Sequence, residues 1–68
     1  MKITLNNRPE IIPDKDTMTL QELILYKNYS FHMLVTKVND KLVRKEDRDK
    51  ITVKDGDDVL VLHLISGG

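Results

Sequence analysis

The sequence of 68 residues contains no cysteine and no tryptophan, and its eleven basic side chains are balanced by eleven acidic ones. Without cysteine the chain has no disulfide framework, no thiolate zinc site, no iron–sulfur cluster and no thiol nucleophile. Without an excess of positive charge it lacks the electrostatic footprint of a nucleic-acid binder. We therefore expect no nucleic acid among its partners.

Long hydrophobic runs and a secretory leader are also missing. The longest apolar stretch, near the end of the chain, is far shorter than the roughly 20 residues that span a membrane as a helix. The N-terminus has no cationic region followed by an apolar one, so no signal peptide is predicted. We expect a soluble, cytoplasmic protein that binds no membrane.

The short length limits what the chain can build. A domain of this size buries only roughly 60% of the surface that its unfolded chain exposes, which leaves little room for a substrate cleft. Hydrophobic residues nevertheless make up 40% of the sequence, and charges of the two signs alternate along it. This composition is typical of a folded chain. We expect one domain, residues 1–66, followed by a flexible tail, residues 67–68.

The start of the sequence predicts a β-hairpin. Residues 1–5 alternate between apolar and polar side chains, as a half-buried strand does. Residues 6–9 contain asparagine and proline, which favour turns. Residues 10–12 resume the extended pattern, which ends at Pro13 because proline donates no hydrogen bond to a ladder.

A polar connection, residues 14–17, then leads into one short helix. Thr19, with Glu22 three residues later, fits a capping box, and Thr17 is a competing N-cap. Asn28 is a plausible stop. The apolar residues at helical spacing are Leu20, Leu23 and Ile24.

The second half predicts further strands. We expect a loop at residues 29–32, a strand at 33–38, a tight turn at 39–41 and a short returning strand at 42–43. The charged stretch 44–50 favours a solvated loop or single helical turn over a binding patch.

The last segments return to the core. Residues 51–53 dip back toward it, and residues 54–57 form a turn in which Gly56 takes a positive φ. Residues 58–66 are the most apolar part of the chain.

This last segment is apolar on both faces of the predicted strand. A strand of this kind is normally central in its sheet, whereas one short helix covers only one sheet face. The other face is then an exposed apolar patch, which usually marks a protein partner. One side carries Val59, Val61, His63 and Ile65, and the other carries Leu60, Leu62 and Leu64. The element order predicts an α+β roll of the β-grasp (ubiquitin-like) type, with four to five strands in a mixed sheet and one main helix on one face.

No catalytic or metal-binding constellation emerges from the sequence. His32 and His63 are isolated, without metal-ligand spacing. His63 and Ser66 lie three apart on the predicted strand, so they point to opposite faces. The acidic turn near Gly56 lacks the terminal glutamate of a calcium loop. We expect neither an enzyme nor a metal site.

The final Gly67 and Gly68 form the most informative motif. At an average glycine usage of about 7%, such a pair arises there by chance in roughly one chain in two hundred. Only Ser66 separates the pair from the apolar strand. Because glycine has no Cβ, this tail can thread a narrow active site and present its carboxylate to another enzyme. A truncated linker or cloning remnant is the alternative interpretation.

Together with this tail, several segments resemble the ThiS family of sulfur carrier proteins in thiamine biosynthesis. These segments are "MKITLNN", "TLQELI", "VND", "KDGD", "DVLVLHLI" and "SGG", which extend over essentially the whole chain. The small subunit of molybdopterin synthase is similar but is usually somewhat longer, and it often has prolines where this chain has His63 and Leu64.

The resemblance implies a carrier that binds no cofactor itself. An E1-like (ThiF-like) adenylyltransferase would use ATP to convert the Gly68 carboxylate to an acyl-adenylate. Sulfur from a cysteine desulfurase relay would replace AMP and leave a thiocarboxylate, which thiazole synthase (ThiG-like) would consume. The docking face implied by the resemblance is the sheet face away from the helix and carries Leu60, Leu62 and Leu64.

Several alternatives remain open at this point. The pattern alone does not say which side of the last strand faces the core, so Leu60 and Leu62 are core residues in the alternative arrangement. A molybdopterin synthase subunit, a ubiquitin-like modifier of lysines and a non-reactive interaction domain remain alternative functions.

Overall fold

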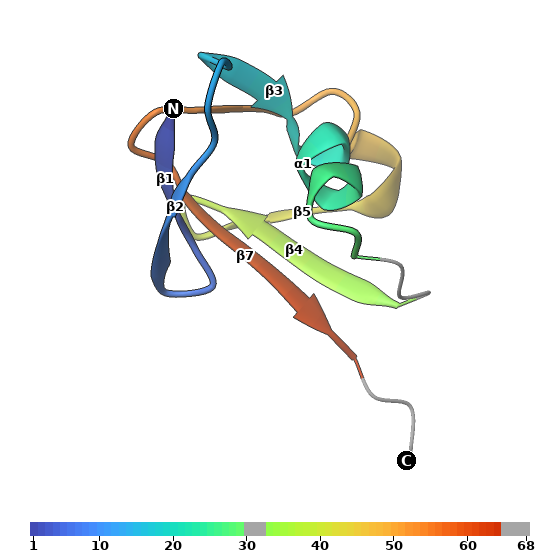
Figure 1. The fold of residues 1–68 in the computed structure, drawn as a ribbon. Coiled ribbons are helices and arrows are strands. Elements are labelled where there is room, and N and C mark those ends of the chain that lie inside the picture. Colours follow the sequence, from blue (N-terminus) through green and yellow to red (C-terminus); the bar gives the residue numbers. More distant parts are fainter. Residues whose placement is uncertain (30–32, 65–68) are drawn as a thin grey trace.

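The computed structural model describes residues 1–29 and 33–64. Figure 1 shows one α-helix against a twisted sheet, with a smaller pair of strands beside it. In chain order the elements are β1 (Lys2–Leu5), β2 (Arg8–Ile11), β3 (Thr17–Thr19), α1 (Leu20–Tyr26), β4 (Leu34–Val38), β5 (Lys41–Val43), the 3₁₀ turn η1 (Lys45–Asp47), β6 (Thr52–Lys54) and β7 (Asp58–His63). No helix in these two ranges is long and apolar enough to cross a membrane.

The main sheet has five strands in the order β2-β1-β7-β4-β5. Strand β7 lies parallel to β1 and antiparallel to β4, so the sheet is mixed. The predicted central position of the last strand is confirmed, because β7 has a hydrogen-bonded neighbour on each side. With α1 over one face, the predicted α+β roll is also confirmed (Figure 1).

The two short strands β3 and β6 correct the sequence analysis. Residue 17 was expected in a polar connection, but Thr17–Thr19 pairs antiparallel with Thr52–Lys54 as a second sheet. Met18 and Val53, which face each other in this ladder, are both buried. A three-residue strand with one buried side chain has too little alternation to be recognised from its own sequence.

The helix begins as the capping box predicts. The amide N–H of Glu22 donates to Oγ1 of Thr19 (3.0 Å), and the amide of Thr19 donates to a carboxylate oxygen of Glu22 (2.8 Å). This reciprocal pair identifies Thr19, not Thr17, as the N-cap. The backbone hydrogen bond from Thr19 is the main cause that lowers the pKa of Glu22. Asn28 follows the helix with φ 58°, which confirms the predicted stop.

Two hairpins turn through paired left-handed residues. Asn6 and Asn7 connect β1 to β2, and Asn39 and Asp40 connect β4 to β5, all with positive φ. Two-residue turns of this kind match the twist of antiparallel strands. The prediction for residues 6–9 was partly wrong, because Arg8 and Pro9 belong to β2. Proline is tolerated there because β2 is an edge strand.

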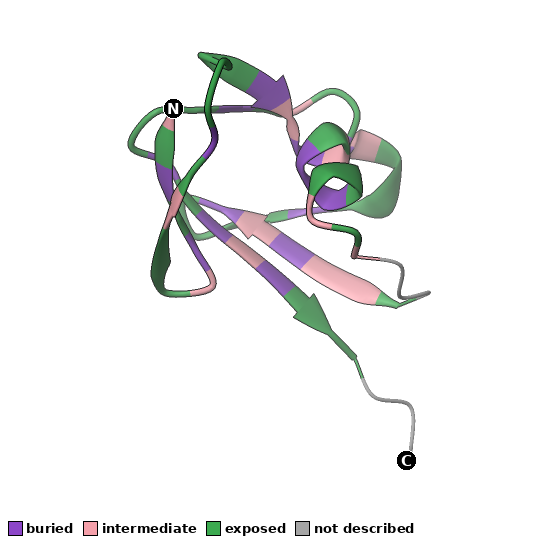
Figure 2. Ribbon diagram, in the orientation of Figure 1, coloured by how far each residue is buried: buried purple, intermediate pink, exposed green. Residues whose placement is uncertain are grey.

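The hydrophobic core lies between the main sheet and the helix (Figure 2). Its members come from both sheets and α1, together with Ile12 directly after β2. The contribution of both sheets to one core explains why the short β3–β6 pair is stable. The core members are Ile3, Leu5, Ile12, Met18, Leu20, Leu23, Ile24, Val38, Val43, Val53, Val59 and Val61. Gly56, at φ 88°, forms the predicted turn before β7.

The charged stretch 44–50 forms the predicted single helical turn, but one of its residues is not solvated. Arg48 is only 8% exposed. Its Nε donates to Oγ1 of Thr36 (3.1 Å), and a terminal nitrogen donates to the carbonyl of Leu34 (2.8 Å). The Thr36 hydroxyl in turn donates to the carbonyl of Val43 (2.7 Å). The long side chain of Arg48 therefore ties the turn to β4.

Candidate functional site

Strand β7 presents its alternate residues to two different environments. Val59 and Val61 are 0% and 5% exposed and belong to the core. Leu60 is half-buried, whereas Leu62 and Leu64 are 48% and 46% exposed. The strand therefore has its valine side toward the helix and its leucine side away from it.

The register places further residues on the side of the sheet away from α1, which we call the outer face. Across from β7, Val35 pairs with Leu62 and Lys37 pairs with Leu60. The backbone N–H of Leu64 donates to the carbonyl of Met33 (3.0 Å), which continues the same alternation.

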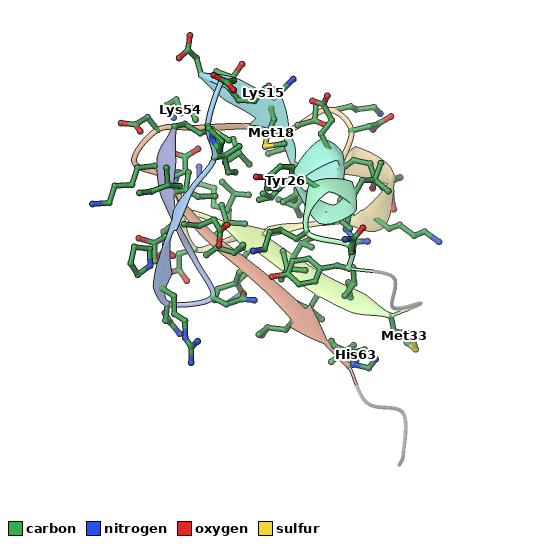
Figure 3. All side chains as sticks on the ribbon, viewed as in Figure 1. Lys15, Met18, Tyr26, Met33, Lys54 and His63 are labelled. Carbon is green, nitrogen blue, oxygen red and sulfur yellow. The ribbon has the colours of Figure 1, made fainter. Side chains whose placement is uncertain are left out.

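Three exposed hydrophobic residues of this face were missed by the sequence analysis. Leu42 pairs with Lys37, Ile11 pairs with Lys2, and Met33 precedes β4. All three side chains are more than half exposed. The signal that finds them is strand register, because each is the apolar residue that alternates with a core-facing one. Figure 3 shows Met33 close to the end of β7.

The start of β7 is held by a cluster of polar contacts. The side chain of Asn39 donates to Asp57 (3.0 Å) and accepts from the backbone N–H of Asp58 (2.9 Å). The N–H of Lys54 donates to the other Asp57 oxygen (3.0 Å), and its ammonium lies 3.3 Å from the first. Burial raises the pKa of Asp57, but these hydrogen bonds outweigh that effect and leave the pKa lowered.

The C-terminal end of β7 has fewer side-chain hydrogen bonds than its start. Strand β1 ends at Leu5, and the side chain of Asn6 then accepts a hydrogen bond from the N–H of Val61 (2.8 Å). The bond from Leu64 to Met33 follows. Ser66, Gly67 and Gly68, the predicted tail, lie outside the described residues. In the sequence, Gly68 lies four positions after Leu64.

The family model that describes the ThiS family matches residues 3–68 of this sequence. The chain belongs to the ThiS family. The match includes the Gly67–Gly68 pair and, apart from Lys2 at the start of β1, every strand that the structure describes. A comparison with curated proteins found no significant match to this chain.

Two solved structures are similar to this ThiS-family chain over its full length. The crystal structure of thiamine biosynthesis protein ThiS from Geobacter metallireducens is 28% identical, with each chain covered completely and a TM-score of 0.90. A solution structure of a thiamine biosynthesis protein from the same organism is 27% identical, with 88% of that chain covered and a TM-score of 0.78. These likenesses confirm the predicted β-grasp fold.

The described residues of this ThiS-family chain contain no group of three or more potential metal ligands. An open pocket of about 500 Å³ lies between the β1–β2 hairpin and the end of α1. Glu10 and Lys27 form an ion pair in its lining (3.1 Å). The other lining residues are Leu5, Asn6, Arg8, Pro9 and Tyr29, which bring no nucleophile and base together.

Proposed function

We propose that this chain is a sulfur carrier protein of thiamine biosynthesis that carries sulfur on the Gly68 carboxyl group. The family match through residue 68 carries the proposal, because it covers the tail together with the fold. The absence of cysteine from the sequence supports it as well. A chain without a thiol holds no persulfide of its own, so a carboxyl group is the available attachment point.

The proposed chemistry begins with activation of that carboxylate. Oxide is a poor leaving group, so an E1-like, ThiF-like adenylyltransferase joins the Gly68 carboxylate to the α-phosphorus of ATP and releases pyrophosphate. ATP thus belongs to the partner, and this chain is a co-substrate rather than an enzyme. Because adenylation consumes ATP, the cytoplasm is the proposed compartment.

Sulfur then replaces AMP. A persulfide supplied by a cysteine desulfurase relay attacks the acyl carbon, and AMP departs with the electron pair of the broken C–O bond. A thiol reduces the S–S bond of the resulting acyl disulfide and leaves the Gly68 thiocarboxylate. Thiazole synthase, ThiG-like, takes the sulfur from this group.

The proposed division of the chain follows from how far the tail extends beyond the fold. Residues 1–66 form the globular part, and Gly67 with Gly68 forms the tail. Four residues beyond Leu64 extend at most about 14 Å. Since glycine has no Cβ, the last two positions fit a channel that larger residues would block. The partner must therefore contact the end of β7 while its active site holds Gly68.

The outer face supplies the proposed docking surface for that contact. Leu60 and Leu62 lie on β7 and Leu64 directly follows it, and Leu62 and Leu64 are substantially exposed. A contiguous apolar surface of this kind usually marks a protein interface.

A loading assay tests the proposal. The protein is incubated with a ThiF-like adenylyltransferase and ATP, then with a cysteine desulfurase and thiol. Pyrophosphate release and intact mass are followed. We expect an acyl-adenylate first and a thiocarboxylate after sulfur is added.

Two tail variants provide the controls. Deletion of Gly68, or addition of one residue after it, is expected to abolish loading without changing the melting temperature. Loading of either variant would contradict the proposal. Lysine conjugates recovered from cells would instead indicate a modifier, and loss of molybdoenzyme activity on deletion, without a thiazole requirement, would indicate the molybdopterin synthase subunit.

A further inference from the structure

One charged residue lies inside the apolar part of the outer face. Lys37, on β4, pairs with Leu60 of β7 on one side and with Leu42 of β5 on the other. The residue is half-buried. Its side-chain ammonium takes part in none of the ion pairs or hydrogen bonds of residues 1–29 and 33–64. Within the described part of the chain, Lys37 is thus a cation without an ionic partner, and it lies between two leucines.

The other charges on this face do not neutralise Lys37. Asp58 is the acidic residue on the outer side of β7, two positions before Leu60, and it forms no ion pair with Lys37 among the described residues. Lys2, on the outer side of β1, adds a second positive charge. The outer strand positions therefore carry two ammonium groups and one carboxylate, although the whole chain has no net charge.

An enzyme that acts on the tail must cover this region. Its active site has to lie within about 14 Å of Leu64. A stable interface takes about 800 Å² from each partner, which is about a sixth of the 4958 Å² surface of this chain. Such an area extends beyond Leu62 and Leu64 to the neighbouring pair Leu60 and Lys37. A covered ammonium without a counter-charge is strongly unfavourable.

We propose that the adenylating enzyme presents a carboxylate side chain to Lys37, set within an apolar surface that covers the leucines of β7. Lys37 then selects for an enzyme with that carboxylate over one that has an apolar or basic residue there. This inference rests on the proposed function. A second copy of the chain fits the face less well, because its outer strand positions carry the same excess of positive charge.

Two substitutions of Lys37 test the proposal, with Lys45 as the matched control. Lys45 is an exposed lysine of the 3₁₀ turn and belongs to no ion pair of the described residues. Affinity for the ThiF-like enzyme is measured at low and high salt for Lys37→Glu, Lys37→Met and Lys45→Glu. Thermal melts verify that each variant is folded.

The expected order is distinctive. Lys37→Glu should weaken binding about 100-fold, because two carboxylates would meet in the interface. Lys37→Met should weaken it about tenfold, because the carboxylate of the enzyme loses its partner while the aliphatic stem is kept. Lys45→Glu should stay within about twofold. At saturating carrier, kcat for adenylation should be unchanged in the Lys37 variants.

Three results would overturn the inference. One is a Lys37→Met variant that binds as tightly as the wild type. Another is equal behaviour of Lys37→Glu and Lys45→Glu. The third is a wild-type dimer in solution that Lys37→Glu changes. If the wild type itself is never adenylated, the proposed function fails instead, so the two failures are distinguishable. Single Asp→Lys or Glu→Lys substitutions in the enzyme provide a rescue test. One of them should restore binding of the Lys37→Glu variant.

Discussion

The two ends of β7 differ sharply although they belong to one strand of six residues. At its start, Val59 is fully buried, and Asn39 and Asp57 hold the backbone through several hydrogen bonds. Toward its end, Leu62 is about half exposed, and so is Leu64, which directly follows the strand. Figure 2 shows this change from buried to exposed residues along the strand.

This difference in burial implies that the start of β7 serves folding, whereas its end is available for binding a partner. The start is constrained on both sides, so changes there act on stability. The end projects past β1 and contributes little to the core, so its leucines are available to a partner. The same substitution placed at the two ends should therefore have opposite consequences.

The largest effect is expected for Val59→Asp. A carboxylate at a fully buried position has no counter-charge, and a domain of this size has only a few kcal/mol of stability to lose. The variant should be unfolded at 25 °C by far-ultraviolet circular dichroism. The milder Val59→Ala should remain folded but lose about 2 kcal/mol. A folded Val59→Asp variant would show that this end of β7 is not the stabilising one.

A second prediction isolates the polar contacts at the start of β7. Asn39 has φ 50°, so Asn39→Gly keeps the backbone conformation and removes only the side-chain hydrogen bonds. Urea denaturation should show a loss of about 2 kcal/mol. The neighbouring Asp40→Gly is the control. Asp40 has φ 68° and is exposed, so glycine there should change stability by less than about 0.5 kcal/mol. Equal losses would assign the effect to the turn backbone.

The pH dependence of the free energy of unfolding tests the stabilising role of Asp57. Its pKa is lower in the folded than in the unfolded chain, so the folded state binds fewer protons in acid. The resulting stability is fully present above the unfolded pKa of about 3.9 and is lost as pH falls through the folded pKa. Asp57→Asn should cost about 1 kcal/mol at pH 7. The difference from wild type should shrink as the pH is lowered from 6 to 3, and a constant difference would exclude this role.

The smallest change in stability is expected at the other end. Leu62→Asp places a charge on an exposed position, so the free energy of unfolding should change by less than about 0.5 kcal/mol. Adenylation by the ThiF-like enzyme should nevertheless fall strongly, because the carboxylate would be buried in the docking surface. Leu25, exposed on α1, offers the control substitution Leu25→Asp, with adenylation retained. Unfolding of Leu62→Asp would refute the assignment of the outer face.

Local features of the fold were predictable from the sequence. The capping box at Thr19, the stop at Asn28 and the turn at Gly56 each depend on residues within a few positions of one another. The central place of β7 followed from its apolar character on both faces. In each case the deciding interaction is short in sequence or is a property of a single segment.

Long-range features were not predictable in the same way. Strand β3 exists because Met18 meets Val53, which lies 35 positions later in the chain, and neither segment signals its partner. Arg48 is buried because Thr36 and Leu34 offer acceptors, and a charged stretch alone does not reveal them. Likewise, the exposed places of Met33 and Leu42 follow from register rather than from composition.

Part of the candidate site stays a prediction. Two adjacent glycines indicate the tail, which lies outside the described residues, and family resemblance indicates that the leucines of β7 form the docking face. Their side of the strand could not be chosen from hydrophobicity, since valine and leucine are both apolar. It is decided by the side on which α1 packs. The place of Lys37 between two leucines likewise depends on β5 and β7, which flank it.

The topology also bears on how the molecule assembles. Because the sheet order places β7 between β1 and β4, the last strand in sequence joins two hairpins that are otherwise not neighbours. Contacts between residues so distant along the chain slow folding, since the two ends of a long intervening segment must first be brought together. A product cut or terminated before Asp58 would lack the strand that unites the halves. Gly68, which we propose as the sulfur-carrying residue, thus follows the strand that completes the sheet, so chains that contain it also contain the strand needed to finish folding.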